Sequence, residues 1–276
     1  MITQTLPKAW KLFTENKKYL GLIIIIELIF LSLFGTLQYY LFYPSGEAAN
    51  RAGEIIAQEM QKLQESEVYQ LESILANNPE FMQAYNDLLK ALSYFVFGVL
   101  ILWIIFKGLS WHLAHKSVLR KIKLQQTWWK FALLSAFWFA IIMAILLIYG
   151  LLEGSAALIP MESATATTWI MTLIFLLIFY FAQISFALIP AQQTFKNTFV
   201  YGWKHAKTII PGFLVNLLIT FIFLTIPFTW PEFAPKIGIQ PYTKLFTATI
   251  LITVIVSILA LAFARLHMIV TTWEKQ

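Results

Sequence analysis

The sequence predicts an all-α integral membrane protein with six transmembrane helices. Hydrophobic residues make up 59% of the chain and charged residues only 12%, whereas soluble domains carry about 25% charged residues. Six stretches reach the roughly 20 apolar residues that a helix needs to cross a bilayer. They are residues 19–43, 90–109, 131–152, 168–190, 209–230 and 244–266. We expect a single membrane domain over residues 1–276, with an acidic helical insert at 44–89.

The first predicted span follows a basic segment, as the apolar part of a secretory signal does. Lys17 and Lys18 directly precede it. Its apolar part is longer than that of a signal peptide, and it runs into Tyr39 and Tyr40 without a small-residue cleavage site. We therefore interpret it as a retained transmembrane helix.

Lysine and arginine are distributed unevenly between the two sides of the predicted membrane. Fifteen of the 20 fall in the N-terminal segment, in the loops at 107–130 and 196–207, and in the C-terminal tail. Because basic residues favour the cytoplasmic side, we expect a multi-pass protein of the cell membrane with both termini in the cytoplasm. This asymmetry accounts for the net charge of +6, so we expect no nucleic-acid partner.

The sequence offers few groups for catalysis or metal binding. It has no cysteine, which excludes thiolate nucleophiles, and it has no phosphate-binding loop or serine nucleophile motif. His112 and His115 stand close together in the sequence, but no carboxylate lies near them and a zinc site takes three or four protein ligands. We interpret them as interfacial histidines, and we predict no metal, no cofactor and no enzymatic activity.

A Trp-Lys pair recurs close before three of the predicted spans. The pairs are Trp10-Lys11, Trp129-Lys130 and Trp203-Lys204. Tryptophan prefers the headgroup level and lysine reaches beyond it into water, so we interpret the three tryptophans as interface anchors. Each predicted hairpin starts and ends on the cytoplasmic side, which favours three parallel hairpin repeats, each preceded by an interfacial helix. The alternative is that such pairs mark any cytoplasmic interface.

The third of these segments resembles the recurring segment of a known membrane domain. The string FALIPAQQTFKNTFVYGWKHAKTIIPGFLVNLLIT, residues 186–220, contains a hairpin end, a short amphipathic helix with Gly202 before Trp203, and a glycine-containing start of the next span. It is similar to the membrane domain attached to some glycerophosphodiester phosphodiesterases and to stand-alone six-helix relatives of unknown function, and the opening AWKLFTENKKYLG is similar too. The resemblance implies a six-helix membrane module without catalytic residues, because the phosphodiesterase itself is a separate soluble domain.

Residues 44–89 form the one hydrophilic insert of the chain. Apolar residues recur there at three- and four-residue steps, which predicts an amphipathic helix, and Asn78 before Pro79 predicts the N-cap of a second helix. The first apolar stripe is Ala49, Ala52, Ile56, Met60 and Leu63. Acidic residues outnumber basic ones in the insert, which disfavours binding to an anionic membrane surface. We expect a helical hairpin outside the membrane, either solvated or docked on a protein partner or a second copy of the chain.

The third predicted span contains a regular series of small residues. They are Ala132, Ala136, Ala140, Ala144, Gly150 and Gly154. Small residues at four-residue spacing let two helix backbones approach closely in lipid. The series therefore predicts a helix-packing seam.

Three polar side chains form a candidate intramembrane cluster. Glu27, Gln183 and Asn216 all fall in the inner half of the predicted membrane, and a charged residue in lipid faces the bundle interior. We expect a neutral, protonated Glu27 that shares hydrogen bonds with Gln183 or Asn216. Lys107 and Arg265, the nearest cations, are expected to point outward to the interface.

These observations favour a non-enzymatic multi-pass membrane module that interacts with lipids or with a protein partner. The alternative is a small-solute or ion transporter that uses Glu27 as its intramembrane carboxylate. Several buried ionisable groups in one cavity would favour transport, whereas a tightly packed interior of small residues would favour the module.

Overall fold

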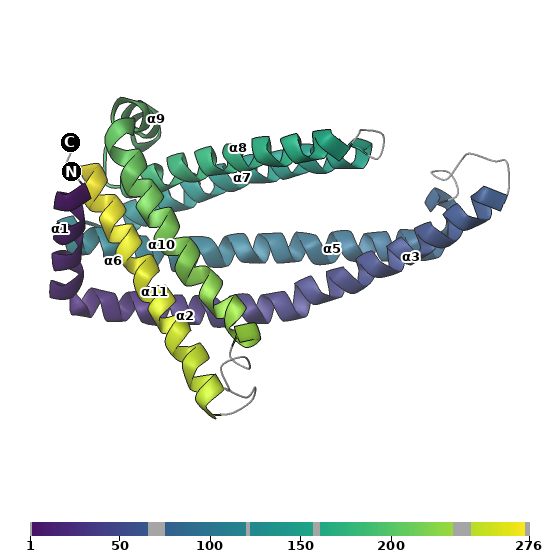
Figure 1. Cartoon of the computed structure of the whole chain (residues 1–276), viewed down its shortest axis with the longest axis horizontal. Coiled ribbons are helices and arrows are strands. Elements are labelled where there is room, and N and C mark those ends of the chain that lie inside the picture. Colours follow the sequence, from purple (N-terminus) through teal and green to yellow (C-terminus); the bar gives the residue numbers. More distant parts are fainter. Residues whose placement is uncertain (1, 66–74, 120–121, 157–160, 234–243, 274–276) are drawn as a thin grey trace. The chain divides into compact units, whose positions relative to one another are not determined.

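The computed structural model describes residues 2–65, 75–119, 122–156, 161–233 and 244–273, which form helices joined by short turns, with no strand among them (Figure 1). The helices with described bounds are α1 (Ile2–Glu15), α2 (Lys17–Leu37), η1 (Gln38–Phe42), α3 (Tyr43–Glu65), α5 (Pro79–Leu102), η2 (Trp103–Lys107), α6 (Gly108–Leu119), α7 (Leu124–Ala156), α8 (Met161–Ala187), α9 (Thr194–Lys204), α10 (Ala206–Phe233) and α11 (Lys244–Trp273). The all-α fold class is confirmed for these residues.

Five helical segments of the described chain are long and apolar enough to cross a membrane. They are Lys17–Lys62, Pro79–Leu119, Leu124–Gly150, Thr168–Ala187 and Ile252–Trp273. A sixth is reached only if Thr194–Lys204 and Ala206–Ile222, which meet at 98°, are counted together as one span. The class of membrane protein predicted from composition is thus supported, while the number six stays a prediction.

The chain divides into two compact units, and the single membrane domain expected from the sequence stays a prediction. One unit comprises residues 1–27 and 106–276, and the other comprises residues 28–105. The second unit contains the predicted insert at 44–89.

The insert forms a hairpin in which α3 packs against α5. Ala48 and Ala52 of α3 and Ala84 of α5 are buried, with 1%, 7% and 4% of their surface exposed. Small side chains let the two helices approach closely. Arg51 and Asp87 form an ion pair of 3.8 Å at the edge of this contact.

The start of α5 confirms the predicted cap. Asn78 Oδ1 accepts hydrogen bonds from the backbone N–H groups of Glu80 (3.0 Å) and Phe81 (3.1 Å), and Pro79 opens the helix. These contacts satisfy two donors that a helix start leaves free.

The apolar stripe predicted for α3 is only partly correct. Ala52 and Ile56 face the hairpin, whereas Ala49 and Met60 are exposed, and Leu63 lies outside the residues whose side chains the structure describes. The buried face of α3 instead contains Ser45, Ala48 and Ala52, at three- and four-residue steps. The exposed alanine, Ala49, lies one residue away from this face.

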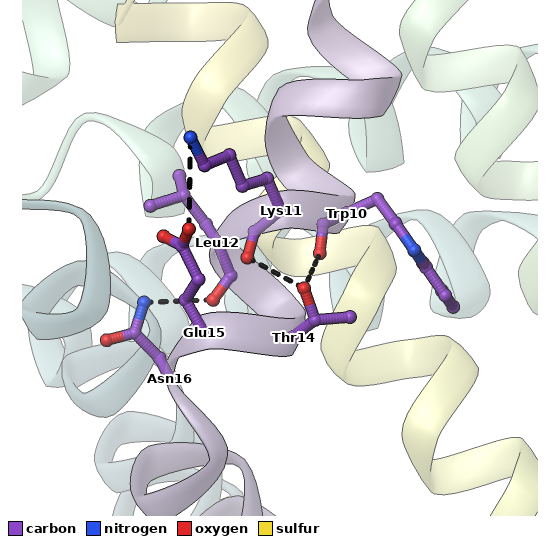
Figure 2. A network of polar contacts seen from close by, with 6 residues as sticks. All are labelled: Trp10, Lys11, Leu12, Thr14, Glu15 and Asn16. Carbon is purple, nitrogen blue, oxygen red and sulfur yellow. Dashed lines mark hydrogen bonds and ion pairs between the residues drawn. The ribbon is translucent and has the colours of Figure 1, made fainter.

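In the first unit, α1 packs along α11 and meets the start of α2 at a corner (Figure 1). Asn16 forms that corner, since its N–H bonds Leu12 O at 3.1 Å while its carbonyl accepts from Leu20 N at 3.1 Å. Figure 2 shows the side chains that close the end of α1: Asn16 Nδ2 donates to Leu12 O (2.9 Å), and Thr14 Oγ1 lies 3.1 Å from Trp10 O. These side-chain donors add second hydrogen bonds to carbonyls in the last turns of α1.

The small residues of α7 do not form a packing seam within the chain. Ala136, Ala140, Ala144 and Gly150 are exposed, Ala132 is half-buried, and Gly154 lies outside the described side chains. The buried face of α7 consists of bulky residues, namely Phe131, Leu134 and Trp138. Within the described chain, α7 therefore turns Phe131, Leu134 and Trp138, and not the alanine series, toward its neighbours. Packing of the alanine series against another molecule stays a prediction.

A buried charge cluster as the candidate functional site

Glu27 lies on the face of α2 that the fold buries. Ile23, Glu27 and Phe30 recur at four- and three-residue steps, and each is buried, Glu27 with 1% of its surface exposed. Because α2 is apolar on nearly all sides, the sequence alone does not identify this face. The carboxylate nevertheless points into the protein, as predicted.

Two cations and a hydroxyl group contact the Glu27 carboxylate. Lys107 Nζ donates a hydrogen bond to Glu27 Oε2, and Ser110 Oγ donates one to Oε1 at 2.9 Å. Arg265 Nη1 of α11 lies 2.6 Å from Oε1. Lys107 and Arg265 are themselves buried, with 7% and 9% of their surface exposed. We call Glu27, Lys107, Ser110 and Arg265 the charge cluster.

The π-helix η2 positions two members of the charge cluster. A π-turn inserts one extra residue into an α-helix, so that the side chains after it move to a different face. η2 ends at Lys107, and Ser110 follows one turn later in α6. Both side chains face Glu27, so this local break in the helix aims them at the carboxylate.

The charge cluster holds more positive than negative charge. One carboxylate stands against the ammonium of Lys107 and the guanidinium of Arg265. Buried ions are costly unless they are paired and their donors are satisfied. Yet Arg265 Nη1 is buried and makes no hydrogen bond, because its N–H groups are not directed at the nearby Oε1. The arrangement can hold an additional negative charge.

The predicted cluster of Glu27, Gln183 and Asn216 does not form. Asn216 Oδ1 instead bonds His267 Nδ1 at 2.8 Å, and Gln183 is half-buried without a hydrogen bond to Glu27. The predicted outward orientation of Lys107 and Arg265 is also wrong. The physical reason is that a buried carboxylate attracts the nearest cations inward, and two cations in contact favour its ionised form.

Buried histidines link several helices of the first unit. His115 Nε2 lies 3.0 Å from Ala187 O, to which Trp273 Nε1 also donates at 2.9 Å. His267 joins Asn216 to Thr5, with Nε2 at 3.2 Å from Thr5 Oγ1. His115 and His267 are fully buried and His112 is 7% exposed, so these side chains pack inside the protein. The interfacial depth expected for His112 and His115 stays a prediction.

Lys130 also takes part in this packing. Its Nζ donates to Ile189 O (3.1 Å) and Ala191 O (2.8 Å), just after the C-terminus of α8. A cation is favourable at a helix C-terminus. Lys130, His115 and Trp273 thus all bond carbonyl oxygens at or just after the C-terminus of α8.

Sequence reasoning missed Lys107, Ser110 and Arg265 as members of the site. Lys107 falls inside the predicted span 90–109, and Arg265 inside 244–266. Ionisable residues within spans pair with one another as a rule. That positional signal could have identified both cations, whereas nothing in the sequence marks the π-helix that aims Lys107.

Comparisons of this chain with family models, with curated proteins and with solved structures find no match.

Proposed function

We propose that this chain is a non-enzymatic multi-pass membrane module that interacts with membrane lipids on its cytoplasmic side. The observation that carries the proposal is the arrangement of α1 and α9. Each buries a small residue, Ala9 or Gly202, and exposes the tryptophan that follows it. The exposed fractions are 57% for Trp10 and 68% for Trp203.

Close packing anchors α9 against the protein. A Cβ atom on Gly202 would stand 2.7 Å from Phe181 Cε1, and Tyr180 donates to Gly202 O at 2.8 Å. The exposed side of each helix carries a tryptophan beside a lysine, Trp10-Lys11 on α1 and Trp203-Lys204 on α9. Interfacial amphipathic helices combine these features, with aromatic residues at headgroup level and lysine toward anionic lipid. Trp129 of α7 is likewise exposed, at 58%.

A recurring spacing supports the threefold repeat that we include in the proposal. The same order of residue types occurs on α1, α6 and α9. It is a hydroxyl residue, then three residues of any type, a small residue, an aromatic residue (Trp or His) and a lysine. The segments are 5–11, 110–116 and 198–204. In each, the hydroxyl residue and the small residue are buried. Each of these helices precedes a helix of membrane-spanning length, which is what three related hairpins would produce.

The proposed topology has six spans, both termini in the cytoplasm, and the insert outside. Thr5 of α1 contacts His267 of α11, so the first and last helices meet, as termini on one side would require. The insert offers a docking surface to a protein partner or a second copy of the chain. Met82, Tyr85 and Leu89 of α5 are exposed there, by 38%, 42% and 45%.

Spin-label depth measurements test the proposal. Because the chain has no cysteine, Lys11→Cys and Lys204→Cys each give a single labelling site beside an intact tryptophan. In vesicles containing anionic lipid, we expect both labels at headgroup depth. Met60→Cys in the insert is the aqueous control, and Leu133→Cys on the exposed face of α7 is the hydrocarbon control. If the Lys11 and Lys204 labels behave like the aqueous control, α1 and α9 do not bind lipid.

A second candidate function is transport of a small anion or of protons. The observation in its favour is that three buried ionisable groups, Glu27, Lys107 and Arg265, meet at one point. Protein-dependent ion flux into reconstituted vesicles that Glu27→Gln abolishes would support transport over the lipid-interacting module.

A further inference from the structure

The guanidinium group of Arg265 has more donors than partners. Arginine carries five N–H donors in a rigid planar fork. Among the described residues, its ion-pair partner is Glu27, and the contact at Nη1 lacks hydrogen-bond geometry although the atom is buried. About nine-tenths of the residue is buried. The buried guanidinium group therefore has N–H donors that a bound anion could engage.

The Glu27 carboxylate is already shared. Lys107 bonds one of its oxygens and Ser110 the other. The single negative charge therefore stands between two cations. Within the charge cluster, two cations share one carboxylate, and the Nη1 atom of Arg265 makes no hydrogen bond to it.

We propose that Arg265 and Lys107 form a binding site for the phosphate group of an anionic lipid. The planar fork of arginine matches two phosphate oxygens, and lysine adds a compact point charge. Basic pockets between membrane helices on the cytoplasmic side bind anionic headgroups in this way. Glu27 pairs with both cations when the lipid is absent, and it competes with the lipid phosphate for them when the lipid is present. The assignment of a lipid as the source of the phosphate rests on the proposed function.

Thermal unfolding of the purified full chain in mixed micelles tests the site. A ligand that binds the folded state raises its melting temperature in proportion to the logarithm of its concentration. We expect phosphatidylglycerol to stabilise the protein and phosphatidylcholine, which carries no net charge, to do so far less. Inorganic phosphate is the third probe. If it stabilises as strongly as phosphatidylglycerol, the phosphate site stands and the lipid as its source is wrong.

Two substitutions are expected to change the response in opposite directions. Glu27→Gln removes the competing charge and keeps the shape, so we expect tighter binding of phosphatidylglycerol by about tenfold or more, as the loss of a nearby like charge implies. Arg265→Gln should abolish the response, and Arg265→Lys should restore only part of it because the fork is lost. A merely structural cluster predicts the same effect for both positions, namely lower stability with no change in lipid response.

Arg51→Gln is the matched control, because Arg51 also pairs with a carboxylate but is exposed on the insert. It should leave the lipid response unchanged. If Arg265→Gln alone does not fold, the double variant Glu27→Gln with Arg265→Gln avoids an unbalanced carboxylate and should fold without responding to phosphatidylglycerol. A retained response in that variant, or weaker binding by Glu27→Gln, would overturn the proposal.

Discussion

Glu27→Leu is expected to lower the free energy of unfolding by about 3 to 5 kcal/mol, the cost of removing one partner from a buried ion pair. The substitution leaves Lys107 and Arg265 buried, with 7% and 9% of their surface exposed, and without their carboxylate. Reversible unfolding of the purified protein in detergent measures the change. The loss should be largest when no anionic lipid is present, because the lipid would replace the missing counter-charge.

Two further variants show whether this loss comes from unpaired charge. Asp87→Leu removes a carboxylate from an exposed ion pair, in which 46% of the aspartate side chain is exposed, and should cost no more than about 1 kcal/mol. The triple variant Glu27→Leu, Lys107→Met, Arg265→Leu replaces the three charged members of the charge cluster by apolar groups and should regain most of the stability. If Glu27→Leu alone has no effect, the two cations are not held by the carboxylate.

Trp138→Ala is expected to be the most damaging truncation on α7, with a loss of about 3 to 5 kcal/mol. Trp138 is only 6% exposed and its Nε1 donates to Ser185 Oγ of α8 at 2.9 Å. Truncation leaves a cavity between the two helices and a buried hydroxyl group that loses one partner. The melting temperature of the variant in detergent measures the effect.

Ala136→Leu, on the same helix, serves as the contrasting variant. Because Ala136 is exposed in the chain, the larger side chain should change stability by no more than about 0.5 kcal/mol. A loss comparable to that of Trp138→Ala would mean that the alanine ridge packs against another helix, as the small-residue spacing originally predicted.

The parts of the fold that depend on local chemistry could be predicted from the sequence. The apolar stretches predicted the membrane-length helices, because bilayer thickness sets their length. The cap at Asn78 was predicted correctly, because a side-chain oxygen beside a proline-initiated helix has a specific hydrogen-bonding role. The buried position of Glu27 followed from the cost of placing a carboxylate in lipid.

The face that a helix turns toward the protein interior could not be predicted from the sequence. α2 and α7 are apolar all round, so their sequences carry little periodicity to indicate the buried face. The packing seam expected at Ala136 and Ala140 therefore does not coincide with the face that α7 buries within the described chain. The partners of Glu27 depended on η2, a π-helix that rotates Lys107 inward and has no recognisable sequence signal.

Infrared difference spectroscopy of wild type against Glu27→Gln is the sharpest test of the charge cluster, because the difference isolates the charge state of this single side chain in the membrane. We predict that at neutral pH the difference spectrum contains the carboxylate stretching bands of one side chain, because two cations, Lys107 and Arg265, contact Glu27. A carbonyl band of a protonated carboxylic acid, lost in Glu27→Gln, would contradict an ion-paired Glu27.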